Sequence, residues 1–165
     1  MYNFSMDEMF LKLEKTLLTL MRGTKEYYHG LKTRECLLKM RQNAEYELKI
    51  AALAHDIERA VDKLPGLDLP TLERGEKEDY YDYKQRHADR SAAIVKFIMK
   101  EEGFPISKVK RVFNAISKHE FGGDADSNLV RDADSIRYFE DGLSRYIKSY
   151  GIQSAEEKAE FMYSR

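Results

Sequence analysis

The sequence predicts an all-α protein, a compact bundle of six to seven helices. Apolar residues recur at intervals of three and four along most of the chain, which is the spacing of one helix face. Prolines and glycines are few, and half of them lie in two breaks, at residues 62–78 and at Gly122-Gly123. A chain of 165 residues, of which 42% are hydrophobic, suits one domain with a buried core. We therefore expect a single helical domain over residues 1–165.

The first half of the chain predicts three helices. The first covers about residues 5–21, with Ser5 and Glu8 at capping-box spacing and Gly23 after its end. Its apolar face consists of Met6, Met9, Phe10, Leu13, Leu17 and Leu20. The second covers about residues 27–41, with Leu37 and Met40 facing inward. The third covers about residues 45–61 and passes through Leu48, Ala51, Ala52 and Leu53.

The second half predicts the remaining helices, after a loop at residues 62–78. That loop is either a lid over a site or a surface connection. A helix over about residues 82–102 is stopped by Gly103 and Pro105, and one over about residues 107–120 ends at Gly122-Gly123. The next covers about residues 126–150 and carries Leu129, Ile136, Phe139, Leu143 and Ile147. Ser154 and Glu157 again have capping-box spacing and open a short last helix.

Composition excludes several classes of protein. The net charge of −1 provides no basic field, so we expect no nucleic-acid polymer as a partner. No apolar run approaches the ~20 residues that span a bilayer, and the first residues lack a basic signal-peptide start. The single cysteine, Cys36, excludes an internal disulfide. We expect a cytoplasmic protein with no membrane partner, and the sequence predicts no oligomeric state.

The four histidines, His29, His55, His87 and His119, are the first candidate functional residues. Each lies near one end of a different predicted helix and on the apolar side of that helix. Two interpretations are open. A buried histidine can satisfy both ring nitrogens with hydrogen bonds, whereas a shared metal ion satisfies several imidazoles at once. Four inward histidines favour the metal ion.

Two segments supply carboxylates that could complete such a site. Asp56 directly follows His55, and adjacent helix residues point about 100° apart, so both reach one ion only at a helix junction. Asp132 and Asp134 lie among the apolar residues of segment 129–140. The helix dipole explains carboxylates at the start of a helix, but it explains Asp134 less well because that residue lies about two turns in.

The order of these residues resembles the HD superfamily of metal-dependent phosphohydrolases. The resemblance covers roughly residues 27–150 and rests on His29, the pair His55-Asp56 in AALAHDIERA, His87, His119 and the DAD element at 132–134. It implies an all-α fold in which a divalent ion is bound by His29, His55, Asp56 and Asp134. The family's A-D-x-L pattern matches Ala133-Asp134-Ser135-Ile136, whereas helical phase alone keeps Asp132 as the alternative ligand.

The resemblance also assigns roles beyond this ion. It implies that His87 and His119 serve a second metal ion, the substrate phosphate or general acid catalysis. One or two ions are compatible with it, and Mn, Mg, Co, Ni, Fe and Zn are not distinguished. The family's frequent HDIGK is HDIER here, so Glu58 and Arg59 replace a glycine and a lysine and no role carries over to Arg59.

The implied function is a metal-dependent phosphohydrolase that cleaves a small phosphate ester, such as a nucleotide, with metal-activated water. The candidate substrate-binding residues are Arg90, Lys118, Arg137 and Tyr138, each beside or one turn from a candidate ligand. The alternative for the basic residues is an ordinary surface charge, and for Tyr138 it is helix packing. Two other functions remain open, an HD-type di-iron oxygenase and a non-catalytic metal- or nucleotide-binding module.

Overall fold

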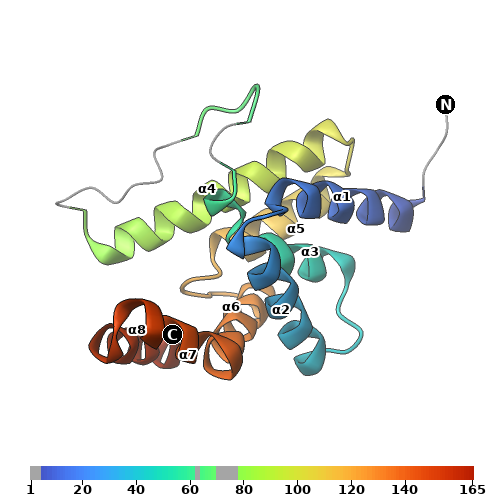
Figure 1. The fold of residues 1–165 in the computed structure, drawn as a ribbon. Coiled ribbons are helices and arrows are strands. Elements are labelled where there is room, and N and C mark those ends of the chain that lie inside the picture. The colour runs from blue at the N-terminus through green and yellow to red at the C-terminus, as the bar shows by residue number, and fades with distance from the viewer. Residues whose placement is uncertain (1–4, 62–63, 70–77) are drawn as a thin grey trace.

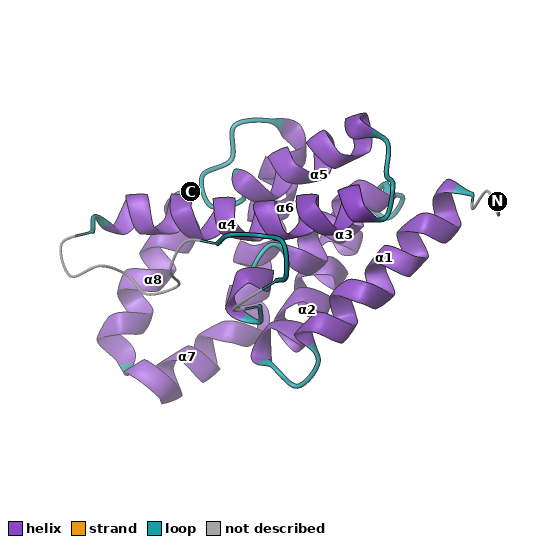
Figure 2. Cartoon of the chain, turned by 90° about the horizontal axis from the view of Figure 1, so that it is seen from above, coloured by secondary structure: helices purple, strands orange, loops and turns teal. Residues whose placement is uncertain are grey.

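The structure, a computed structural model, describes residues 5–61, 64–69 and 78–165 and consists of helices there (Figure 1 and Figure 2). In chain order the α-helices are α1 (Met6–Met21), α2 (Lys25–Met40), α3 (Tyr46–Ala54), α4 (Tyr80–Glu101), α5 (Ile106–Ser117), α6 (Ala125–Arg137), α7 (Leu143–Tyr150) and α8 (Ile152–Ser164). A 3-10 segment, η1 (Ile57–Arg59), follows α3, and a π-helical segment, η2 (Tyr138–Gly142), joins α6 to α7.

The predicted all-α bundle is confirmed. Because η2 continues α6 directly into α7, the described ranges hold seven helices besides η1, and they contain no strand. Of the loop expected as a lid or a surface connection, residues 62–63 and 70–77 lie outside the described residues. None of the described helices combines the length and the apolarity that crossing a bilayer requires.

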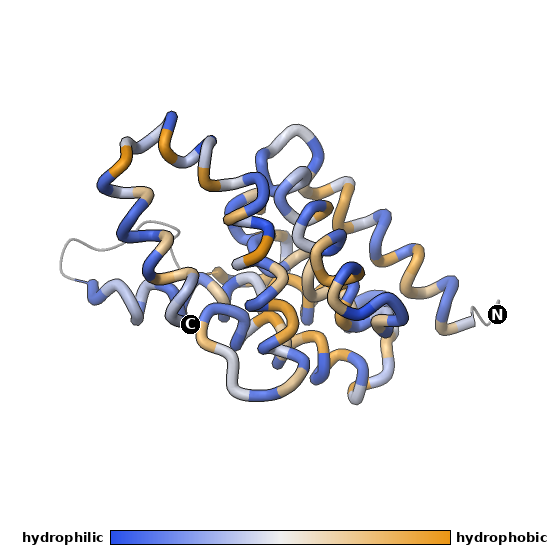
Figure 3. Tube along the Cα trace, turned by 90° about the horizontal axis from the view of Figure 1, so that it is seen from below, coloured by the Kyte–Doolittle hydropathy of each residue, from blue (hydrophilic) through white to orange (hydrophobic). Residues whose placement is uncertain are grey.

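The hydrophobic core lies where α1 to α6 pack together, and α7 and α8 extend away from it below α4 (Figure 1). Hydrophobic stretches of the chain concentrate in this central region and along α1 (Figure 3). Its large, fully buried side chains include Phe10, Leu17, Leu37, Leu53, Ile94 and Met99. Each such side chain contributes roughly 1.5–3 kcal/mol when it leaves water, so this region supplies the stability on which the polar centre depends.

Of the two predicted capping boxes, one forms. Ser5 Oγ accepts from the backbone N–H of Glu8 at 3.2 Å, and the Ser5 N–H donates to the Glu8 carboxylate at 2.8 Å. The box predicted at Ser154 is wrong because α8 begins two residues earlier, at Ile152. Gly151 has a φ of +86°, a conformation that glycine adopts without strain, and it turns the chain directly from α7 into α8.

The third predicted helix is shorter than expected. It ends at Ala54, and His55 and Asp56 form the junction between α3 and η1. His55 Nδ1 lies 2.9 Å from the carbonyl oxygen of Ala52, the oxygen that the Asp56 N–H would use in a continuing helix. The histidine side chain thus takes over a backbone acceptor at the point where the helix stops.

The π-helical segment η2 changes which residues face inward. Phe139 and Ile147 were expected on the inner face, but they are 43% and 37% exposed. A π-helical turn holds more residues than an α-turn, so counting at 3.6 residues per turn fails from this segment onward. Met40, also expected inward, is exposed because it is the last residue of α2.

Candidate metal centre

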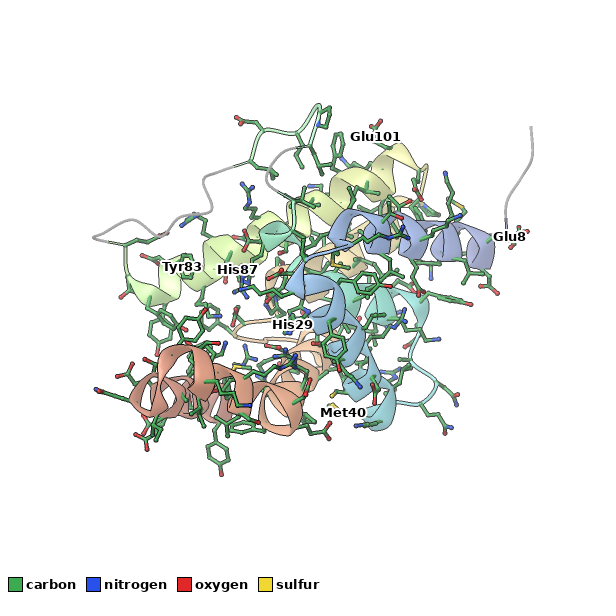
Figure 4. The ribbon with its side chains drawn as sticks, viewed as in Figure 1. Glu8, His29, Met40, Tyr83, His87 and Glu101 are labelled. Carbon is green, nitrogen blue, oxygen red and sulfur yellow. The ribbon has the colours of Figure 1, made fainter. Side chains whose placement is uncertain are left out.

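Six side chains from five segments of the chain converge near the middle of the bundle. They are His29 on α2, His55 and Asp56 at the α3–η1 junction, His87 on α4, His119 after α5, and Asp134 on α6. All of them except the half-buried His29 are buried. His29 and His87 face the same interior region from their two helices (Figure 4).

The first group of ligand atoms comprises the Nε2 atoms of His29 and His55 and Oδ1 of Asp134. The two nitrogens lie 2.9 Å apart, and the Asp134 oxygen lies 3.5 Å from His29 and 3.6 Å from His55. Asp56 adds Oδ2 at 3.3 Å from His29 Nε2. Atoms that bind one small divalent ion at about 2.0–2.2 Å stand roughly 3–3.5 Å apart, so the three atoms of this group have nearly the spacing of one ligand set, and Asp56 lies beside them.

A second group lies beside the first and comprises the Nε2 atoms of His87 and His119 and Oε1 of Glu120. The Glu120 oxygen lies 3.7 Å from His87 and 3.5 Å from His119. Asp56 Oδ1 lies 2.8 Å from His87 Nε2 and 3.7 Å from His119 Nε2. Asp56 therefore faces both groups, each of which could hold an ion.

Three of the histidines have one ring nitrogen already committed. Nδ1 of His55 lies 2.9 Å from the Ala52 carbonyl, and Nδ1 of His119 lies 2.7 Å from the Ile116 carbonyl. Nδ1 of His87 lies 2.6 Å from the Glu58 carboxylate. Carbonyl oxygens only accept hydrogen bonds, so in His55 and His119 Nδ1 donates and Nε2 of the neutral ring carries a lone pair. Within the part of the chain that the structure describes, the buried Nε2 of His119 has no hydrogen-bond partner.

The donor set fits a metal ion. Lone pairs and carboxylate oxygens that converge in a buried site repel one another unless a cation lies between them. An acceptor on the far ring nitrogen is also how metal-binding histidines are commonly oriented. The residues that could hold an ion are therefore His29, His55 and Asp134, with a second position at His87, His119 and Glu120, and Asp56 forms a further group with His55 and His119.

Comparison with known proteins gives a family. A family model described as "Domain of unknown function (DUF4202)" matches residues 13–161. The chain belongs to the DUF4202 family. This DUF4202 match contains every histidine and carboxylate of the two groups. No curated protein and no solved structure matches the chain.

Burial and neighbouring charges shift pKa values in this DUF4202 centre. Burial lowers the pKa of His29 to about 4 and also lowers the pKa of His119. Burial alone would raise the pKa values of Asp56 and Asp134. The positive charge of Arg59 nevertheless holds the pKa of Asp56 well below its ordinary value, and that of Arg165 does the same for Asp134. At neutral pH the two histidines are neutral and the two aspartates ionised, which are the forms that bind metal ions.

Basic side chains orient the carboxylates of the centre. Arg59 donates to Asp56 Oδ2 at 2.7 Å, and Lys84 donates to Glu120 Oε1 at 2.5 Å. Arg165 donates to Asp134 Oδ2 at 2.6 Å and to Glu120 Oε2 at 2.7 Å. The guanidinium of Arg165 thus holds one oxygen of Asp134 and leaves the other facing the histidines.

The centre opens into a cavity of about 890 Å³. His29, Asp56, Glu120 and Asp134 line it, together with residues of α4, α7 and α8. It is therefore large enough for an organic ligand, because such sites measure roughly 300–1,000 Å³.

Two of the four predicted substrate-binding residues line this cavity. They are Arg137 and Tyr138, and the Tyr138 hydroxyl donates to the Ala155 carbonyl at 3.2 Å. Arg90 does not reach it, because its guanidinium is buried 3.4 Å from Glu58 and donates to the Val61 carbonyl. Lys118 follows the last residue of α5 on the outer surface, where it pairs with Asp124 at 3.1 Å.

The alternative ligand Asp132 also lies outside the two groups. Its side chain is 44% exposed and pairs with Arg131 at 2.8 Å. One residue of the DAD element therefore faces solvent while Asp134, two positions on, faces the histidines.

Sequence reasoning missed several residues of the centre. Glu58, Arg59 and Glu120 each lie within three positions of a candidate ligand, so their positions beside the motif were an available signal. Lys84 lies three residues before His87, one turn away on the same helix face. Arg165 lies 30 residues or more from both of its carboxylate partners, and no local pattern indicates it.

Proposed function

We propose that this DUF4202 chain is a metal-dependent phosphohydrolase of the HD type that cleaves a small phosphate ester, such as a nucleotide. The order of the motif residues and their resemblance to the HD superfamily support this proposal. The net charge of −1 argues against a nucleic-acid polymer as the substrate.

One observation carries the proposal. Nδ1 of His55 and of His119 donates to a backbone carbonyl, so Nε2 of each ring faces the ionised carboxylates, Asp56 and Asp134 for His55 and Asp56 for His119. Among the described residues, the buried Nε2 of His119 lacks a hydrogen-bond partner. In the proposal His29, His55, Asp56 and Asp134 hold a divalent ion. Such an ion, when bound, lowers the pKa of water toward neutrality and offsets charge on phosphoryl oxygens.

The chain's own residues supply the rest of the proposed chemistry. The carboxylate of Glu58 lies 2.6 Å from Nδ1 of His87, so that Nε2 of His87 faces Asp56 and Glu120. We assign His87 and His119 either to a second ion or to the substrate phosphate, with His87 or His119 as general acid toward the leaving oxygen. Buried Glu120 supports the two-ion form because it adds a carboxylate to that pair.

The test compares Asp56→Ala with Asp68→Ala. Asp56 faces both ligand groups, whereas Asp68 is exposed in the described loop segment 64–69. We expect Asp56→Ala to lose metal and hydrolysis of a generic phosphate ester while it keeps its helicity, and Asp68→Ala to match the wild type. Metal content is measured by elemental analysis and helicity by circular dichroism. Full metal content and full activity in Asp56→Ala would refute the proposal.

A second candidate function is a di-iron oxygenase of the HD type. The second ligand group, His87, His119 and Glu120, favours it because two adjacent positions could hold two irons. Two bound irons and oxygen-dependent turnover would support the oxygenase, whereas activity with Mn, Mg, Co, Ni or Zn would support hydrolysis. Bound metal with neither activity would indicate a non-catalytic binding module.

A further inference from the structure

Most basic side chains that line the cavity are neutralised by a carboxylate. Arg59 pairs with Asp56 and Lys84 with Glu120, as described above, while Lys25 lies 4.0 Å from Glu26 and Arg145 pairs with Asp141. Two cavity-lining cations remain, Arg137 and Lys158, and neither forms an ion pair with any residue in the described ranges. Of the described cavity-lining residues, these two are the cations available to a ligand.

Arg137 is held in the cavity wall without a polar partner for its Nε. That nitrogen is buried and makes no hydrogen bond to the described residues. The guanidinium lies against Gly142, where a Cβ would approach its Nη1 to 2.9 Å. The absence of a side chain at position 142 therefore leaves room for the guanidinium at the cavity surface.

Lys158 comes from α8, on the side of the cavity that α7 and α8 form. Its Nζ lies over the rings of Tyr146, at 4.6 Å from the centroid, and Tyr138, at 5.2 Å. The charges that act on it most strongly are those of Asp134, Lys84 and Arg59, all of them in the metal centre. A half-buried ammonium between aromatic rings, with no carboxylate of the described residues at ion-pair distance, is a site at which an anion is stabilised.

We propose that Arg137 and Lys158 form the subsite that binds a dianionic phosphate group, so that the cavity selects phosphate monoesters over diesters. This inference rests on the proposed function and names its substrate class. The carboxylates of the centre already have Arg59, Lys84 and Arg165 as partners, so two further positive charges are left unbalanced beside it. A monoester carries about two negative charges at neutral pH, as phosphorylated side chains do, whereas a diester carries one.

The rest of the cavity wall suits the organic part of such an ester. Six tyrosines line it, namely Tyr28, Tyr80, Tyr83, Tyr138, Tyr146 and Tyr150. Tyrosine rings stack on flat ligands and their hydroxyl groups bind polar substituents. The alcohol portion of the substrate is therefore expected to be a polar, ring-containing group that stays within the cavity.

The test measures ligand binding without requiring turnover. Calorimetry with inorganic phosphate in Mg²⁺ buffer is carried out on the full chain and on Lys158→Met, Arg137→Gln and the control Lys148→Met, an exposed lysine of α7. We expect each cavity variant to weaken phosphate binding ten-fold or more and the control to match the wild type. Competition should show that wild type binds 4-nitrophenyl phosphate more tightly than bis(4-nitrophenyl) phosphate, and that Lys158→Met loses this preference.

Thermal unfolding separates a binding role from a structural one. A half-buried lysine without an ion pair opposes folding, so Lys158→Met should unfold at a higher temperature than the wild type even as it loses phosphate. Wild-type phosphate affinity in both cavity variants, or no phosphate binding by the wild type, would overturn the inference. If the phosphate results hold but neither ester is hydrolysed with any metal, the subsite stands and the proposed hydrolase function fails.

Discussion

Replacing Gly30 by alanine tests the contact that brings the first two histidines together. Gly30 follows His29 on α2, and α2 packs there against the end of α3. A Cβ at position 30 would overlap the carbonyl oxygen of Leu53, two residues before His55. Because the obstacle is backbone, no side-chain rotation relieves it, and the two helices must separate.

Two opposing effects determine the size of the change in stability. Alanine is favoured over glycine inside a helix by roughly 0.8–1 kcal/mol. Overpacking of a closely packed contact costs about 1–3 kcal/mol, and an overlap with backbone lies at the upper end. We therefore expect Gly30→Ala to lower the free energy of unfolding by about 2 kcal/mol. The same separation moves His29 away from His55, so metal affinity should fall with it.

Urea unfolding and equilibrium metal titration measure the two effects. The control is Glu35→Ala on the exposed face of the same helix, which should change the free energy of unfolding by less than about 0.5 kcal/mol. If Gly30→Ala is as stable as the wild type and binds metal equally well, α2 and α3 are not in this contact. The reasoning that places His29 beside His55 would then be wrong.

Three further outcomes are expected. Asp134→Asn should weaken metal binding roughly ten-fold or more in an equilibrium titration, whereas Asp132→Asn at the half-buried neighbouring carboxylate should not, and equal effects would contradict the assignment of Asp134. Glu58→Ala should lower the free energy of unfolding by about 1–3 kcal/mol because the buried Nδ1–H of His87 loses its acceptor. Glu58→Gln keeps an acceptor oxygen and should lose less in urea unfolding, so a loss as large as that of alanine would contradict this reason. Burial lowers the pKa of Lys158 to about 8, so its charge and the phosphate affinity should fall above that pH in calorimetry, and Lys158→Met should lack this pH dependence.

The inward positions of the four histidines could be predicted because helical phase is a local property. His29 and His87 lie within α2 and α4, so counting residues places their side chains correctly. His55 and His119 follow the ends of α3 and α5, and each bonds through Nδ1 to the carbonyl three residues earlier. Periodicity predicts their inward direction but not this local bond, which depends on the ring geometry of the residue that ends the helix.

The cations around the centre could not be assigned in the same way. Arg90 shares a helix face with His87, as predicted, yet Glu58 from another segment draws its guanidinium away from the cavity. Arg165 reaches Asp134 and Glu120 only because α8 folds back across the centre. Spacing along one helix indicates a face, whereas the partner of a long basic side chain depends on segments that are distant in the sequence.

The π-helical segment η2 divides one continuous helix into two parts, one that faces the histidines and one that lines the cavity. Asp134 precedes the segment and faces the histidines, while Arg145 and Tyr146 follow it and line the cavity wall. A π-helical turn takes up about one more residue than an α-helical turn in the same rotation, so deleting one residue within it would restore an α-turn and leave the later side chains facing nearly as before. In evolutionary terms, loss of a single codon here would leave both the candidate metal ligands before the segment and the cavity wall after it in place. Segment η2 is thus a point at which the length of the chain can change without altering the direction of either part of the helix.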